Sequence, residues 1–303
     1  MKNKELIVKF APVARKNLNK TFFTLFIIVI LESLCSALFV GTSLLLNSMQ
    51  DSFAVTFFSY ALMFCGVFFW FLILSGFATM LLRMARDEFV TIGFLFYGFR
   101  RFKQFAPAAF LYTLLTGISA AVVAGTMYFI TKSNPDFIVN LQSKFGENAF
   151  LYLLIIFSFI LVFLLIFPQV FLFFLKYDNP SRSVFSLAFL SSKLLFKNIF
   201  KFIGFVFMAG GRNLILAAFY FGITLSFSAA QKGGAVQFFS LIFDFLYFIN
   251  FYKALSLMSL AVPFFYENLR QPAVEIVVSL KKMMMKFCWK IKILTKIIRT
   301  ANN

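Results

Sequence analysis

The chain has 303 residues, 61% of them hydrophobic, and its formal net charge is +18. Histidine is absent, so the commonest general base and the commonest metal ligand in proteins are missing. A mean hydropathy of +0.90 excludes an ordinary soluble domain and predicts an integral membrane protein.

Six apolar stretches are each long enough to cross a hydrocarbon core of about 30 Å as an α-helix. They cover residues 22–46, 57–81, 106–130, 150–175, 202–228 and 238–263. The first is too long for the core of a cleaved signal, so we expect it to be retained as a span. The expected fold is an all-α, polytopic transmembrane helix bundle over residues 1–266, followed by a basic tail over residues 267–303.

Cationic residues set the orientation of the spans, because short cytoplasmic loops carry the excess of Lys and Arg. The N-terminal segment, the loops after the second and fourth spans and the tail together hold 24 Lys and Arg residues. The loops on the opposite side hold three: Lys132, Lys144 and Lys232. The asymmetry predicts that both termini are cytoplasmic, in a bacterial inner membrane, and it explains the net charge without nucleic-acid binding.

Each odd-numbered span follows a basic segment that also carries apolar residues. The three segments are VARKNLNKTFFTLFII from Val13, FYGFRRFKQFAPAAFL from Phe96 and SSKLLFKNIFKFIGFV from Ser191. This composition is typical of an amphipathic helix that lies in the headgroup layer. One interpretation is three repeated units, each an interfacial helix followed by a two-span hairpin; the other is that all basic loops in a Phe-rich chain look alike.

Four ionisable residues fall inside the expected spans: Glu32, Arg212, Asp244 and Lys253. Such groups are costly in lipid and usually face the bundle interior and pair. We expect them to form a buried polar cluster, either as ion pairs that fix helix register or as a site for an ion, a proton or a polar solute. A third interpretation places Asp244 and Lys253 in a water-exposed vestibule. Gly210 and Gly211 precede Arg212 and mark a candidate helix break.

The tail carries apolar residues at three- and four-residue steps and cations between them. Its basic residues predict adhesion to anionic lipid at the cytoplasmic face, or merely a solvated extension that enforces orientation. They are Lys281, Lys282, Lys286, Lys290, Lys292, Lys296 and Arg299. No protein partner can be assigned from this pattern.

No catalytic or cofactor motif is present, so we expect neither an enzyme nor a bound cofactor or metal. The one acidic doublet, Asp87–Glu88, lies in a basic loop, and we expect it to pair locally with Arg83 and Arg86.

Three stretches carry a family resemblance. They are MARDEFVTIGFLFYGFRRFKQF from Met84, LLIFPQVFLFFLKYDNPSRSVFSLAFLSSKLLFKNIFKFIGF from Leu164, and LSLMSLAVPFFYENL from Leu255. Together they resemble uncharacterised bacterial six-span proteins related to the membrane domain of glycerophosphoryl diester phosphodiesterases. The resemblance implies a bacterial inner-membrane protein without the phosphodiesterase domain, and it supplies no catalytic residue.

These observations favour a non-enzymatic membrane component of lipid or envelope homeostasis. The alternative is a small-solute or ion transporter that uses the charges near the middle of the membrane, and a membrane enzyme is the third interpretation.

Overall fold

The computed structural model describes residues 3–49, 53–133, 143, 149–230 and 240–270. All regular structure in these residues is helical. The elements are α1 (Asn3–Met49), α2 (Phe53–Ala85), η1 (Ile92–Phe96), α3 (Tyr97–Arg100), α4 (Phe102–Ser133), α6 (Ala149–Ile166), η2 (Phe167–Gln169), α7 (Leu172–Asp178), α8 (Val184–Ala230) and the last described helix, Ser240–Arg270.

Five described helices are long and apolar enough to cross a membrane: α1, α2, α4, α8 and the last helix. The prediction of an all-helical fold is confirmed for the described residues, and the five helices agree with the prediction of a multi-pass membrane protein. The stretch predicted as a fourth span, residues 150–175, is not one helix, because α6 ends at Ile166 and α7 begins at Leu172. Pro168 lies in the 3₁₀ turn between them and has no N–H with which to continue an α-helix.

Side chains from neighbouring helices satisfy the backbone of this break. The Ser191 hydroxyl donates to the Pro168 carbonyl at 2.9 Å and accepts the Phe171 N–H at 3.2 Å. The Tyr112 hydroxyl donates to the Gln169 carbonyl. The break is therefore a fixed feature that α4 and α8 hold in place, as a membrane interior demands of any non-helical backbone.

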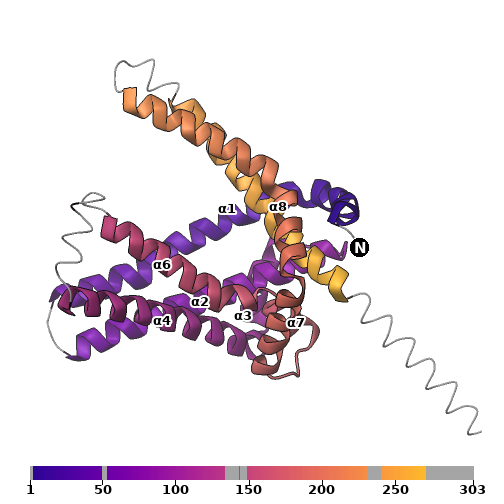
Figure 1. Cartoon of the computed structure of the whole chain (residues 1–303). Helices are drawn as coiled ribbons and strands as arrows, with labels where there is room; N and C mark the ends of the chain where they lie inside the picture. Colours follow the sequence, from indigo (N-terminus) through magenta and orange to yellow (C-terminus); the bar gives the residue numbers. More distant parts are fainter. Residues whose placement is uncertain (1–2, 50–52, 134–142, 144–148, 231–239, 271–303) are drawn as a thin grey trace, which may run out of the picture.

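The long helices form three antiparallel pairs: α1 with α2, α4 with α6, and α8 with the last helix (Figure 1). In the first pair the rings of Phe39 and Phe69 stack with centroids 6.0 Å apart. In the third, Tyr220 packs on Phe243 towards one end and Phe205 on Phe265 towards the other. The third pair is thus in contact towards both of its ends.

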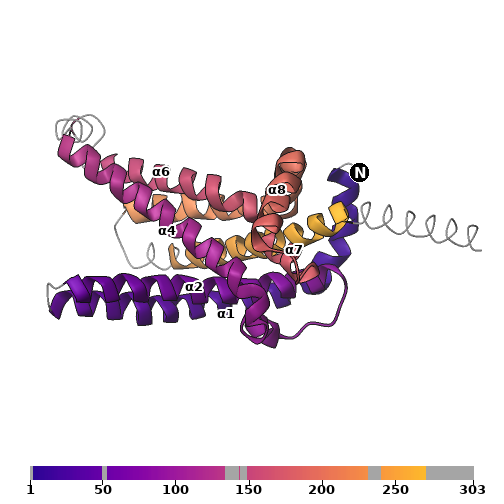
Figure 2. The ribbon, with the colours of Figure 1, turned by 90° about the horizontal axis from the view of Figure 1, so that it is seen from below.

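The three pairs meet at one end and diverge towards the other. Figure 1 shows α8 and the last helix diverging from the remaining helices, and Figure 2 shows α4 and α6 diverging from α1 and α2. The largest fully buried side chains gather near the shared end and include Leu72, Leu95, Phe105, Phe171, Leu187, Phe205 and Leu260. The diverging parts carry exposed apolar side chains such as Phe219 and Phe245, which suit contact with lipid.

The segments that precede the odd-numbered spans differ from one another. In α1 and α8, each 47 residues long, the basic segment and the span form one helix, whose first turns stand at a steep angle to the rest (Figure 2). Before α4, the expected amphipathic helix is replaced by a turn, η1 and the short α3. Gly98 of α3 lies so close to α2 that a Cβ atom there would be 2.2 Å from the Leu72 carbonyl oxygen.

Candidate functional site

A tight turn follows α2 and positions the charged residues of the shared end. The Glu88 N–H donates to the Arg83 carbonyl at 2.9 Å, and Asp87 adopts a positive φ of 59°. Aspartate tolerates this left-handed conformation better than most residues. The turn leaves Asp87 on the surface, where it forms an exposed ion pair with Lys16 of α1.

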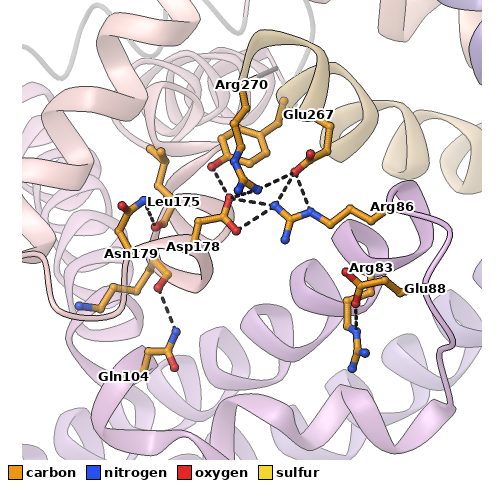
Figure 3. Close-up of polar contacts among 11 residues, drawn as sticks. Arg83, Arg86, Glu88, Gln104, Leu175, Asp178, Asn179, Glu267 and Arg270 are labelled. Atoms are coloured by element: carbon orange, nitrogen blue, oxygen red, sulfur yellow. Dashed lines mark hydrogen bonds and ion pairs between the residues drawn. The ribbon is translucent and has the colours of Figure 1, made fainter. Parts of the chain in front are cut away.

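The local pairing predicted for the acidic doublet is confirmed only for Arg83. Its Nε atom donates to Glu88 Oε2 at 2.6 Å. The prediction for Arg86 is wrong, because this side chain turns away from the doublet and reaches residues far along the chain (Figure 3).

Arg86 lies at the centre of a cluster that joins the three helix pairs. Its Nη2 atom donates to both carboxylate oxygens of Asp178, at 2.8 and 2.9 Å, and its Nε atom donates to Glu267 Oε1 at 2.8 Å. Asp178 ends α7, and Glu267 lies near the end of the last helix. Tyr266 and Arg270 of the last helix also donate to Asp178 Oδ2, at 2.8 and 3.1 Å. We call these five residues the charged cluster.

The cluster is largely withdrawn from solvent and balanced in charge. The side chains of Arg86, Asp178 and Glu267 are 17%, 9% and 15% exposed, and Arg270 supplies the second positive charge. Burial alone would lower the pKa of Arg86, but hydrogen bonds to Glu267 and Asp178 outweigh it and raise that pKa. A buried ion with its partners removed is costly, so each member depends on the others.

Lys176 supports Asp178 from the same short helix. Its ammonium is buried and donates to the carbonyls of Pro180 and Arg182, at 2.9 and 2.8 Å. Burial lowers the pKa of Lys176. On α4, Gln104 donates to the Lys176 carbonyl at 2.9 Å (Figure 3). These bonds fold the turn after α7 back on its helix and hold Asp178 towards Arg86.

The four ionisable residues predicted to cluster inside the spans are exposed in the structure. None of the ion pairs among the described residues joins any two of Glu32, Arg212, Asp244 and Lys253. Glu32 lines a cavity of about 160 Å³ between α1 and α2. Glu32 lies on α1, whereas Arg212, Asp244 and Lys253 lie on α8 and the last helix, and these two helix pairs diverge.

The candidate helix break at Gly210 and Gly211 is wrong, because α8 runs through both residues as an unbroken α-helix. Gly210 instead allows the last helix to pack close to α8. A Cβ atom there would lie 2.8 Å from the Ala254 carbonyl and 2.7 Å from the Met258 side chain on the last helix. The glycine therefore serves close helix packing, as small residues commonly do in membranes.

The lipid-binding residues predicted in the tail, from Lys281 to Arg299, lie outside the described residues. Within the described part of the chain, no group of three or more His, Cys, Asp or Glu side chains is arranged to hold a metal ion.

Comparisons with known protein families, with curated proteins and with solved structures give no match to this chain.

Proposed function

We propose that the chain is a bacterial inner-membrane protein that crosses the bilayer six times, with both termini in the cytoplasm. In addition to the five long helices, α6 would cross the bilayer, because its 18 residues are almost all apolar and extend about 27 Å at 1.5 Å per residue. Three antiparallel pairs support an even number of spans. The cations of the turn after α2 and of α7 lie at the shared end, which the positive-inside rule assigns to the cytoplasm.

The pairs support a threefold repeat of a basic segment followed by two spans. Each unit contributes one residue to the charged cluster from the end of its second helical stretch. Arg86 follows α2, Asp178 ends α7 and Glu267 lies near the end of the last helix. The equal lengths of α1 and α8 agree with this, whereas η1 and α3 depart from it.

Its role, we propose, is that of a non-enzymatic membrane component of lipid or envelope homeostasis. The observation that carries this proposal is an exposed aromatic stripe on the first half of α8. Phe185, Phe189 and Phe200 are 77%, 74% and 89% exposed, and exposed lysines lie among them. Because these turns precede the apolar span, the stripe suits insertion among lipid headgroups and upper acyl chains.

The basic tail would add to this lipid contact by attraction to anionic lipid at the cytoplasmic face. The resemblance to the membrane domain of glycerophosphoryl diester phosphodiesterases agrees with a role beside lipids. The absence of histidine and of catalytic motifs from the sequence supports a role without catalysis.

Depletion of the protein in its host tests the proposed role. We expect an altered phospholipid composition or an altered envelope permeability. Wild-type protein should restore both, whereas a variant with Phe185, Phe189 and Phe200 changed to serine should not. Unchanged lipids and unchanged permeability after depletion would contradict the proposal.

The alternative, a small-solute or ion transporter, is favoured by one observation. Glu32 and Ser36 line the same cavity between α1 and α2. Ion or solute flux into vesicles that contain the purified protein, lost in Glu32→Gln, would support this alternative over the first.

A further inference from the structure

A second, polar cavity of about 440 Å³ adjoins the charged cluster. Its lining comes from the first turns of α1, the turn after α2 and the last helix. The residues are Lys9, Ala85, Arg86, Asp87, Phe264, Glu267 and Asn268. The volume lies within the range of about 300–1,000 Å³ that is usual for small-ligand sites.

The cavity presents positive groups that the described residues do not use. Lys9 makes no ion pair or hydrogen bond with another described residue. Arg86 donates through Nε and Nη2 only, so its Nη1 atom remains available. A guanidinium and an ammonium together are well suited to a phosphate group.

Unused acceptors line the same cavity. Glu267 accepts its hydrogen bonds at Oε1, so Oε2 remains available. Asp87 meets Lys16 through Oδ1, which leaves Oδ2. A purely anionic ligand would bring like charge towards these two carboxylates, whereas a ligand with both a phosphate and an ammonium would satisfy both sets of groups.

Exposed apolar side chains accompany the cavity. Val8, next to Lys9, is 73% exposed, and Phe89, two residues after Asp87, is 79% exposed. Such residues beside charged ones are typical of the layer where headgroups meet acyl chains. Apolar side chains that suit the hydrocarbon part of a lipid thus lie within two residues of two lining residues, Lys9 and Asp87.

We propose that this cavity binds the headgroup of a lipid that carries phosphoethanolamine. The phosphate lies against Lys9 and Arg86, and the primary ammonium donates to Glu267 and Asp87. A quaternary ammonium has no N–H to donate, and a phosphoglycerol has no positive charge, so neither matches both sets of groups. The inference rests on the proposed lipid role and names the lipid class that this surface holds.

Binding of short-chain lipids to the purified full-length protein tests the proposal. The probes are dihexanoyl lipids with phosphoethanolamine, phosphocholine or phosphoglycerol headgroups, and free phosphoethanolamine, each titrated by calorimetry. We expect the phosphoethanolamine lipid to bind at least about tenfold more tightly than the other lipids, as the loss of a hydrogen bond to a charged group predicts. Preference for phosphoglycerol, or equal binding of all three, overturns the proposal.

Free phosphoethanolamine separates the two sources of this chemistry. Weaker binding of the free compound supports a lipid ligand, and equal binding overturns the assignment to a lipid. Lys9→Ala should remove the preference, whereas Lys4→Ala, an exposed change on the same helix outside the cavity lining, should not. Unchanged preference in Lys9→Ala overturns the site. A lipid phenotype on depletion, together with no headgroup preference here, would reject this site and leave the wider role standing.

Discussion

Arg86 links three parts of the fold through partners that its neighbouring residues do not indicate. Its neighbours Asp87 and Glu88 are the obvious local partners, yet its guanidinium binds Asp178 and Glu267, which lie 92 and 181 residues away along the chain. Only the meeting of three helix pairs brings these groups together. One signal was available in the sequence: acidic residues are scarce, and these two lie in basic segments at helix ends.

Asp178→Ala should destabilise the protein strongly. It removes the carboxylate that accepts hydrogen bonds from Arg86, Tyr266 and Arg270, and it leaves the buried Arg86 with one carboxylate fewer. The loss of one partner of a buried pair costs about 3–5 kcal/mol. Thermal unfolding in detergent should show a lowered midpoint. Asp87→Ala, which breaks the exposed pair with Lys16, is the control and should unfold close to wild type.

At the scale of elements, hydrophobic length predicted where the helices lie but not how they end. The expected span over residues 57–81 falls inside α2, and that over residues 106–130 falls inside α4. Pro168 was present in the sequence, but its effect on the fourth stretch depends on Ser191 and Tyr112, which satisfy the freed backbone groups. The sequence also suggested three similar amphipathic helices, whereas close packing at Gly98 requires a different backbone before α4.

Gly98→Ala should lower stability, because the added methyl group would meet the Ser75 hydroxyl and the Leu72 carbonyl, and the carbonyl is a backbone group that no side-chain rotation can move away. Overpacking of this kind typically costs about 1–3 kcal/mol. Gly93→Ala is the matched control, since its nearest neighbouring atom would be 3.7 Å away. Equal thermal midpoints for the two variants would refute the close contact between α3 and α2.

Ser191→Ala tests the break between α6 and α7. The change leaves the Pro168 carbonyl and the Phe171 N–H without their buried partner, at a cost of about 1–3 kcal/mol. Faster hydrogen exchange should follow in peptides that cover η2 and α7. Ser186→Ala, at an exposed position of α8, the helix that carries Ser191, should leave hydrogen exchange in η2 and α7 unchanged.

At the scale of the whole molecule, composition and the length of the apolar stretches were sufficient to predict an all-helical fold, and five of the described helices are long and apolar enough to cross a membrane. The divergence of the three pairs was not predictable, because it depends on which helix faces pack at the shared end. For the same reason, depth along a span was a poor guide to proximity. Glu32, Arg212 and Lys253 all fall well inside the predicted spans and were expected to cluster, but they lie on exposed faces of different helices.

The proposed topology and the charged cluster are tested most directly by finding on which side of the membrane the ends of the helix pairs lie. Single cysteines would be placed at Asp87, Arg182 and Ser143 after replacement of Cys35, Cys65 and Cys288, and labelled with a membrane-impermeant maleimide. We predict that Asp87→Cys and Arg182→Cys react only in inverted vesicles, and that Ser143→Cys reacts only in intact spheroplasts. Labelling of positions 87 and 182 from opposite sides would place the membrane between Arg86 and Asp178 and contradict the charged cluster.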